Sequence, residues 1–566
     1  MLPMSLGRLR VVAVASSVLL LGSLLAVATP YYQTNDDATM HLRSAGVLLT
    51  EQPSEFLLFT HPLIGLALSS LYELQPAWPW YPMHLLLAHL CVAVASGWLA
   101  LRSWGAKGLL AAACFVVIVQ SRFIWNLQFT TVAMLLGVLG VLLLRRGESK
   151  AEWVLGGMMV AWAPLVRFES FQACAALGFT LMVADAMSRP FARRWLWIAT
   201  ALGVLLLAVP ASFQAYYGAD PQWADFGEKN SLKGLFTDSR VLTTQNIPEE
   251  AYAHSELSRV DVQAYQSWLL DESDGLTQQN VQPLLEAADR AEFTRGDLVR
   301  RLDRFGLVVL ESTGCWMLLA GLLLCPMFRM RAGGVVRAAV TLSVAIVMFA
   351  YLLASDPRVP DHVVSPLLVC VMTICLLEIE SLRGWVNRRG ARRLLAAGLL
   401  CAIGSSAVLN VHRSLVWHRL QVLQEQTILP SIELLRNLEG ATVVDIGGGF
   451  PFGTRSVLVD PREAFEGVSL LLGATHALTP DYRLQRNRLG IERLYPELVG
   501  SDRLVLWQPA PQQVVAYYEL LIEKYDLPIA FERVLHHNGR DIVLRVIPGS
   551  GPIDPRTLFE GPLGNL

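Results

Sequence analysis

The sequence predicts an α-helical multi-pass membrane protein of about 11 transmembrane helices with an extracytoplasmic C-terminal α/β domain. Of its 566 residues, 53% are hydrophobic and only 17% are charged, and the mean hydropathy is +0.42. Soluble domains carry about 25% charged residues, so much of this chain must lie outside water. Apolar stretches of about 18 to 20 residues recur, and a helix of that length crosses a bilayer. The net charge of −2 provides no basic field that would favour nucleic acid as a partner.

The candidate spans are apolar segments separated by polar loops. They lie at about residues 9–29, 81–101, 108–121, 129–144, 152–166, 170–187, 194–212, 305–325, 335–354, 362–380 and 394–411. The first segment also matches a signal peptide, because a basic start and an apolar run precede the A-x-A-like site at Ala26–Ala28. Its run of about 18 residues is longer than an ordinary signal-peptide core, and further spans follow, so we expect a retained helix.

The positions of Lys and Arg predict the orientation of these spans. With a cytoplasmic N-terminus, the short outer loops contain only Arg43, Arg122, Arg167 and Arg358. The short inner loops then contain Arg8, Arg10, Arg102, Lys107, Arg145, Arg146, Lys150, Arg189, Arg193, Arg194, Arg329, Arg331, Arg337, Arg383, Arg388, Arg389, Arg392 and Arg393. This imbalance predicts a cytoplasmic N-terminus, and it places both long polar segments outside the cytoplasm.

The chain therefore divides into a transmembrane module at 1–411 and an extracytoplasmic domain at 412–566. The module includes a first outer loop at 30–80 and a large outer loop at 214–304. In the C-terminal domain, TVVDIG, SVLVD and RLVLW predict strands, whereas LQEQTILPSIELLRNL and VVAYYELLIEKY predict helices. Two alternating runs joined by Asn538-Gly539 predict a hairpin.

One segment of this domain, VVDIGGGFPFG, resembles the glycine loop of a nucleotide or S-adenosylmethionine site. Such a loop needs a helix N-terminus directly after it. Here Pro451, Gly453 and the strand-prone RSVLV follow instead. We therefore interpret the segment as a tight turn after a strand.

The pair Asp36-Asp37, in YYQTNDDATM, lies just outside the first span. After it, HLRSAGVLLTEQPSEFLLF and HPLIGLALSSLYEL are too polar or too short to span, and their apolar residues recur at helical spacing. We expect both to be helices in the plane of the interface. Together with the carboxylates, they would form the wall of a cavity open to lipid and water. In the alternative interpretation, Asn35 or Asp36 only caps a helix.

This plan resembles the GT-C superfamily of integral-membrane glycosyltransferases, which includes protein O-mannosyltransferases, aminoarabinose–lipid A transferases and mycobacterial arabinofuranosyltransferases. Arabinofuranosyltransferases carry an Asp-Asp pair at the corresponding place, as NDDATM does here. The segment Thr60–Leu63 is similar to the His-Pro-Pro-Leu segment of the mannosyltransferase loop, with one proline missing. The chain also looks like bacterial multi-spanning proteins with an NDD opening. The resemblance covers residues 1 to about 410.

The resemblance implies transfer of a sugar from a polyprenyl phosphate to a glycan, lipid or protein acceptor on the outer face of the bacterial inner membrane. Asp36 or Asp37 would take the acceptor proton in a single inverting displacement, and we slightly favour Asp36. A cation would stabilise the departing phosphate. The candidates for it are Arg358, Arg167, His362 and Arg122.

Each of these cations also has a purely structural explanation. Arg167 can pair with Glu169, Arg358 can pair with a neighbouring aspartate, and any of them can reach lipid head groups. His61 and Asn35 are the candidate acceptor-binding residues. Interface belts explain most of the aromatic residues near the outer boundaries, although one or two, Trp223 among the candidates, can line an acceptor groove.

We expect no required cofactor, with Mg²⁺ or Mn²⁺ as the alternative, because the outer acids are too few for an obvious metal site. The eight cysteines lie in or beside apolar runs, so neither a disulfide framework nor a zinc site is expected. Two other classes of function remain open. One is a transporter, flippase or polymerase of lipid-linked glycans, and the other is a non-catalytic envelope assembly protein.

Overall fold

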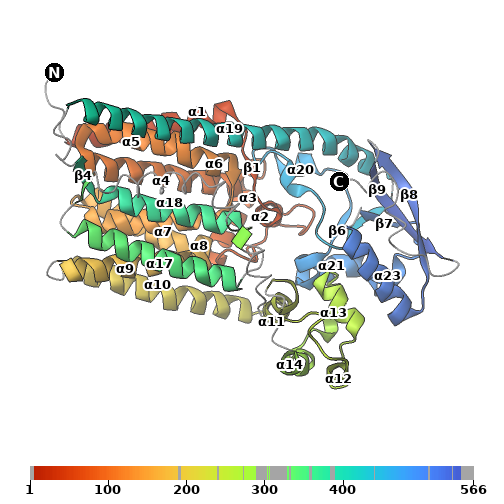
Figure 1. The fold of residues 1–566 in the computed structure, drawn as a ribbon. Coiled ribbons are helices and arrows are strands. Elements are labelled where there is room, and N and C mark those ends of the chain that lie inside the picture. The colour runs from red at the N-terminus through yellow and green to blue at the C-terminus, as the bar shows by residue number, and fades with distance from the viewer. Residues whose placement is uncertain are drawn as a thin grey trace.

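A computed structural model of the chain describes most of its residues. The described residues are 6–188, 193–238, 241–271, 273–288, 302–303, 305, 328–330, 333–355, 360–382, 389–438, 440–507, 510–537 and 540–549. They form a helix bundle and a mixed cap that abuts one end of it (Figure 1). The cap comprises the helices between residues 221 and 287 and the C-terminal sheet with its helices.

The apolar runs of the sequence fold into the helix bundle. Its helices are α1 (Leu6–Val27), α4 (Trp80–Trp104), α5 (Gly108–Cys114), the π-helix η2 (Phe115–Gln120), α6 (Ser121–Trp125), α7 (Phe129–Arg146), α8 (Lys150–Val166), α9 (Phe168–Ser188), α10 (Arg193–Gly218), α17 (Gly334–Ser355), α18 (Asp361–Leu377) and the first part of α19 (Arg389–Arg436). Every expected span coincides with a helix except 305–325, which apart from Phe305 lies outside the described residues.

Within the described residues, five helical segments are long and apolar enough to cross a membrane, as expected of a membrane protein. They are Gly7–Val27, Trp80–Trp125, Phe129–Arg146, Arg193–Gly218 and Gly334–Leu352. The second of these joins two expected spans in one helical run of 46 residues. The count of about eleven crossings stays a prediction.

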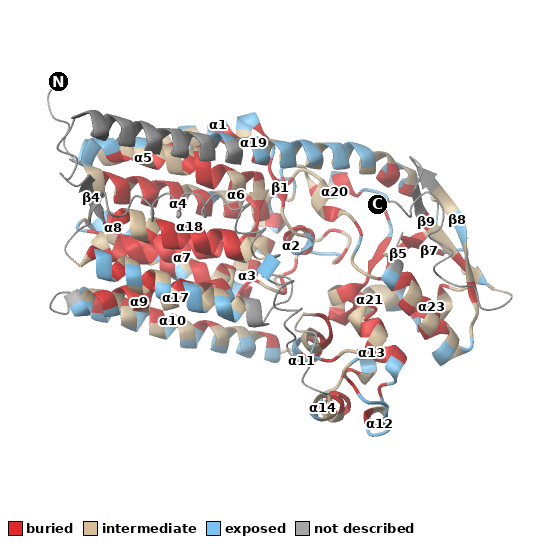
Figure 2. Cartoon of the chain, in the orientation of Figure 1, coloured by how far each residue is buried: buried red, intermediate tan, exposed pale blue. Residues whose placement is uncertain are grey.

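Helix α7 is the centre of the bundle. Protein covers 94% of its most apolar stretch but only 17% of the corresponding stretches of α1, α10 and α17, which face outward (Figure 2). Close packing at the centre depends on small residues. A Cβ on Gly140 would lie 2.9 Å from Cγ2 of Val160 and 3.0 Å from the carbonyl oxygen of Gly156. Such an approach of two helix backbones is typical of helices packed in a membrane.

The cap is built from two segments that lie far apart in the sequence. The first gives α11 (Pro221–Thr237), α12 (Glu249–Tyr252), α13 (Arg259–Gln266) and α14 (Gln278–Ala287). The second gives strands β5 (Thr442–Asp445), β6 (Leu470–Leu472), β7 (Leu504–Trp507), β8 (Ile529–His537) and β9 (Arg540–Pro548). Its helices are α20 (Pro461–Ala464), α21 (Pro480–Arg488), α22 (Leu494–Glu497) and α23 (Pro511–Tyr525), with the short turns η5 (Phe452–Thr454) and η6 (Ala474–Leu478).

The five strands form one sheet in the order β6-β5-β7-β9-β8. Strands β5, β6 and β7 are parallel, whereas β9 is antiparallel to both β7 and β8. The predicted hairpin is thus confirmed by the β8–β9 pairing, and its Asn-Gly connection lies outside the described residues. The predicted strand SVLVD is wrong: residues 456–460 are a loop, and β6 takes the place at the edge of the sheet.

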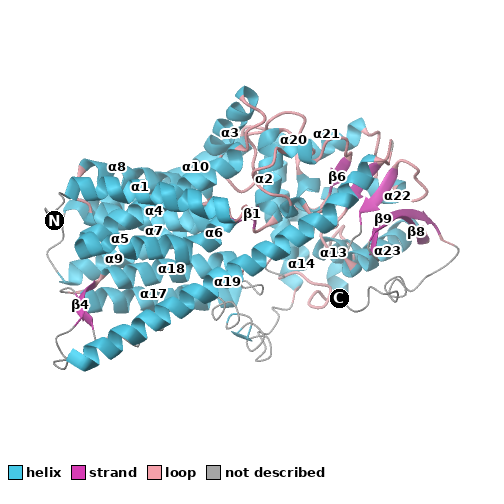
Figure 3. Cartoon of the chain, turned by 90° about the horizontal axis from the view of Figure 1, so that it is seen from above, coloured by secondary structure: helices cyan, strands magenta, loops and turns pink. Residues whose placement is uncertain are grey.

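The two segments of the cap share one hydrophobic core. Trp223 and Phe236 of α11 and Leu270 belong to the same buried cluster as Val444 of β5 and Leu506 of β7. The large loop after α10 and the C-terminal part therefore fold as one body. Helix α19 joins this body to the bundle without interruption (Figure 3), so the predicted boundary at 411/412 falls inside a helix.

The segment after the acid pair differs from the prediction of two long interfacial helices. Helix α2 (Asn35–Ala45) ends at Gly46, whose φ of 69° closes it with a bond from the Val47 N–H to the Leu42 carbonyl. Residues 46–61 have no regular structure, and α3 (Pro62–Leu74) follows. Residues 47–59 look helical in the sequence because Leu49, Leu57 and Leu58 are buried, but they belong to a loop with Pro53 at its middle.

Candidate functional site

The acid pair lies where the bundle meets the cap (Figure 1). Asp36 and Asp37 are the second and third residues of α2, where carboxylates are favoured by the helix dipole. The chain just before them, β1 (Tyr31–Tyr32), pairs in parallel with β2 (Asn126–Leu127). This pairing brings the start of α2 beside the start of α7.

The two carboxylates of the pair have opposite environments. Asp36 is exposed, whereas Asp37 has no exposed surface. Asp37 Oδ1 accepts hydrogen bonds from the Tyr81 hydroxyl at 3.0 Å and from the Phe129 N–H at 3.1 Å. Its Oδ2 accepts a bond from the Thr34 hydroxyl at 2.9 Å. Asp37 therefore connects α2 to α4 and α7 through its carboxylate.

Burial raises the pKa of Asp37 to about 8. The three hydrogen bonds lower this pKa, whereas the negative charge of Asp36 raises it. At neutral pH, Asp37 is therefore mostly protonated. The exposed member of the pair, Asp36, is the one that solvent and a substrate can reach.

A hydrogen-bonded network connects Arg122, one of the predicted cations, to the residues just before α2. Its guanidinium lies 2.8 Å from Oδ2 of Asp361, the first residue of α18. The Gln33 side chain donates to the same oxygen at 3.3 Å, and Gln33 stands three residues before Asp36. His362 lies in the same region, because its backbone carbonyl accepts a bond from the Thr131 hydroxyl at 3.4 Å. Arg358 lies outside the described residues.

The remaining predicted residues have structural partners. Arg167 pairs with Glu169 at 2.8 Å and lies over the rings of Phe59 and Phe129, each 5.2 Å away. This pairing is the structural alternative for Arg167, although Phe129 also supplies an N–H to Asp37. His61 caps α3 by accepting from the Leu63 N–H at 3.2 Å.

The other ring nitrogen of His61 lies 3.0 Å from the Ser212 hydroxyl, and burial lowers the pKa of His61. Both nitrogens are thus engaged within the protein, which makes His61 part of the frame that holds α3 rather than a group directed at a substrate.

The glycine loop of the cap covers the start of α2, which sequence reasoning missed. Asn35 donates to the Gly448 carbonyl at 3.4 Å, and a Cβ on Gly453 would lie 3.3 Å from the Asn35 side-chain oxygen. The buried carboxylate of Asp445 shapes this loop by accepting three backbone N–H groups, from Gly447 at 3.2 Å, Gly449 at 3.0 Å and Phe450 at 2.7 Å. The glycine loop is therefore in close contact with Asn35 at the start of α2, in addition to forming a turn after β5.

The same loop brings a further cation to the site. Arg455 lines a small cavity of about 20 Å³ together with Tyr32, Ala38 and His41 of the α2 region. Glu425 of α19 lies 3.9 Å from Arg455 and also accepts a bond from the Tyr31 hydroxyl at 2.8 Å. The only signal for Arg455 in the sequence was its place directly after the glycines.

Within the described residues, no group of three or more His, Cys, Asp or Glu side chains could hold a metal ion. The site as described is an exposed carboxylate, a buried protonated carboxyl behind it, and cations held by the neighbouring segments. This arrangement can accept a proton from a hydroxyl group and can stabilise a nearby anion.

Comparison of the chain with known proteins does not identify its family. No protein-family model matches it, and no curated protein matches it.

Proposed function

We propose that the chain is a GT-C-type membrane glycosyltransferase, a hexosyl- or pentosyltransferase that uses a polyprenyl-phosphate donor. The observation that carries the proposal is the division within the acid pair. Asp36 is accessible at the junction of an apolar bundle and a polar cap, and Asp37 is buried behind it. A lipid-linked donor would approach this junction from the bundle, and a water-soluble acceptor would approach from the cap.

In the proposed reaction, the acceptor hydroxyl attacks the anomeric carbon of the donor sugar while Asp36 takes the proton. The new carbon–oxygen bond forms opposite the departing phosphate, so the configuration inverts. The electron pair of the broken bond leaves with the polyprenyl phosphate, whose charge Arg122 stabilises. Asp37, with a pKa of about 8, keeps the pair close to a single negative charge at neutral pH, which leaves Asp36 ionised.

The predicted location belongs to the same proposal. The chain lies in the bacterial inner membrane with a cytoplasmic N-terminus and an extracytoplasmic cap. The excess of Lys and Arg in the short loops at the far end of the bundle supports this orientation. The proposed reaction needs no metal ion. Activity that is lost to EDTA and restored by Mg²⁺ or Mn²⁺ would contradict this part.

The test is Asp36→Asn in the full-length chain, reconstituted in lipid vesicles with radiolabelled polyprenyl-phosphate sugars and a panel of glycan acceptors. Loss of a general base lowers a rate by about 10²- to 10⁴-fold, and we expect a decrease in transfer in that range. Asp502→Asn is the matched control, because the Asp502 side chain is 92% exposed and lies in the cap. Transfer by Asp36→Asn at the wild-type rate would overturn the proposal.

Transport of lipid-linked glycans is the second candidate, and one observation favours it. His89 and Gln120 form a buried polar contact inside the bundle, in which the Gln120 amide lies 2.5 Å from the His89 carbonyl. His89 Nε2 has no partner there. Polar groups within a bundle are typical of transport pathways. If His89→Leu abolished glycan export while Asp36→Asn preserved it, transport would replace transfer as the function.

A further inference from the structure

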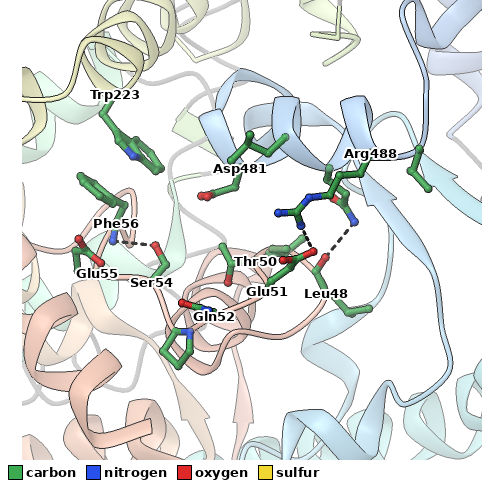
Figure 4. Close-up of a pocket in the computed structure, with 15 residues that line it drawn as sticks. Leu48, Thr50, Glu51, Gln52, Ser54, Glu55, Phe56, Trp223, Asp481 and Arg488 are labelled. Carbon is green, nitrogen blue, oxygen red and sulfur yellow. Dashed lines mark hydrogen bonds and ion pairs between the residues drawn. The ribbon is translucent and has the colours of Figure 1, made fainter. Parts of the chain in front are cut away.

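A second cavity lies between the loop after α2 and the cap, away from the acid pair. It has a volume of about 700 Å³, opens to solvent, and is lined by the loop after α2, by α11 and by α21 (Figure 4). Helix α2 separates it from Asp36, and eleven residues of helix extend over about 16 Å. Cavities of about 300–1,000 Å³ are the usual size of small-molecule sites.

A buried arginine holds the segments around this cavity together. Arg43 is fully buried, donates through Nε to the Phe56 carbonyl at 2.9 Å and pairs with Asp481. Its guanidinium also lies 5.4 Å from the centre of the Trp223 ring. One side chain therefore ties together the three segments that line the cavity.

Backbone strain marks the same loop. Leu48 and Leu58 have positive φ values of 60° and 68°, which are costly for leucine. Strained residues persist only where the surroundings hold them, and they cluster at ligand sites. A Cβ on Gly46 would lie 2.6 Å from the backbone of Gln52 and Pro53, so the loop is also closely folded on itself.

One wall of the cavity is aromatic. The rings of Phe56 and Trp223 are stacked, with centres 4.3 Å apart and planes at 11° (Figure 4). Trp223 is buried behind Phe56, so the half-buried Phe56 is the ring of this pair that a ligand can reach. The face of an aromatic ring is negative, and it attracts the weakly positive C–H groups of a sugar ring.

The opposite wall is polar. Glu51 pairs with Arg488, and the Gln485 amide donates to the Leu48 carbonyl at 3.2 Å. The exposed side chain of Gln52 also lines the cavity, and the half-buried side chain of Glu55 lies beside Phe56 (Figure 4). The charged residues that line the cavity are Glu51, Glu55, Asp481 and Arg488. Because Arg43 pairs with Asp481 and Arg488 pairs with Glu51, the net charge of the lining together with Arg43 is −1, and it comes from Glu55.

We propose that this cavity binds an uncharged or amino-bearing saccharide. Carboxylates and amides pair with hydroxyl groups, the aromatic wall contacts the ring faces, and the negative lining disfavours phosphates and uronic acids. If the proposed function holds, the saccharide is a remote part of the acceptor; that assignment rests on the proposed function, whereas saccharide binding itself does not.

Calorimetry on the full-length chain in lipid nanodiscs tests the proposal with three probes: tri-N-acetylchitotriose, chitotriose and tri-galacturonate. We expect the first two to bind and the third to bind at least about tenfold more weakly, from charge repulsion. Gln52→Ala should weaken binding of both by about fivefold to tenfold, for a lost hydrogen bond. Glu55→Gln should selectively weaken binding of the amino-bearing chitotriose, because it removes a charge and keeps the shape.

The matched controls are Gln279→Ala and Glu523→Gln, two exposed residues of the cap outside the cavity. Equal binding by the cavity variants and their controls, or equal binding of tri-galacturonate, would overturn the saccharide site. Asp36→Asn separates the two proposals, because it should retain saccharide binding while it loses transfer. Binding without transfer by the wild-type chain would support the cavity and count against the glycosyltransferase.

Discussion

The Tyr81 hydroxyl donates a hydrogen bond to the buried carboxyl of Asp37 at 3.0 Å. This bond fixes the first turn of α2 against α4, and it therefore sets the direction of the neighbouring Asp36. The arrangement of the exposed acid depends on a bond that no substrate touches.

Tyr81→Phe should lower the free energy of unfolding by about 1–3 kcal/mol, because a fully buried acceptor loses a partner. Thermal unfolding in nanodiscs measures the change. Tyr252→Phe is the control, since the Tyr252 hydroxyl has no hydrogen-bond partner and its removal should cost little. An equal effect of both substitutions would refute a special role for the Tyr81 hydroxyl.

Stability should depend on pH through Asp37. Burial raises the pKa of Asp37 from 3.8 to about 8, so the folded chain binds this proton more tightly than the unfolded chain. The stabilisation is complete below pH 3.8 and is lost as the pH rises through about 8. Asp37→Asn should therefore reduce the fall in melting temperature between pH 5 and pH 8. Parallel pH profiles for the variant and the wild type would contradict the raised pKa.

Arg122→Gln should raise the donor KM and lower kcat, each by about tenfold, if its guanidinium holds the departing phosphate. Arg167→Gln should have a smaller effect, because Arg122 is connected through Asp361 to Gln33, three residues before Asp36, whereas Arg167 pairs with Glu169. Steady-state kinetics with a polyprenyl-phosphate sugar decide the order. The opposite order would move the phosphate site towards Arg167.

Gly453→Ala should lower transfer activity with less than about 1 kcal/mol change in stability. Its new methyl group would meet the Asn35 side-chain oxygen at 3.3 Å, a closer approach than ordinary contact, so Asn35 must shift. Gly449→Ala in the same loop is the control, because nothing lies within 4 Å of its added Cβ. If both variants lost the same activity, contact with Asn35 would not be the cause.

Much of the bundle follows from the sequence, and much of the cap does not. Apolar runs such as 129–144 predict helices correctly, because a helix long enough to cross a bilayer needs an apolar run of about that length. The position of Asp36-Asp37 after the first span was predictable for the same reason. In contrast, residues 47–59 have helical periodicity yet form a loop, because their leucines are buried by distant segments of the cap.

The contacts that complete the candidate site are long-range. Asn35 and Gly448 are separated by 413 residues, and no local pattern indicates that they touch. The burial of Asp37 beside an exposed Asp36 also depends on Tyr81 and Phe129, which belong to other helices. Sequence periodicity describes which residues are covered, but it does not say which part of the chain covers them.

Helix α19 has one more consequence. Its 48 residues extend over about 70 Å, and Glu425 attaches it to the strand that precedes the acid pair through Tyr31. This one helix runs along the bundle and continues into the cap, so the two parts of the molecule share a single continuous element. Through the Tyr31–Glu425 bond, the position of α19 is coupled to the strand that leads into Asp36.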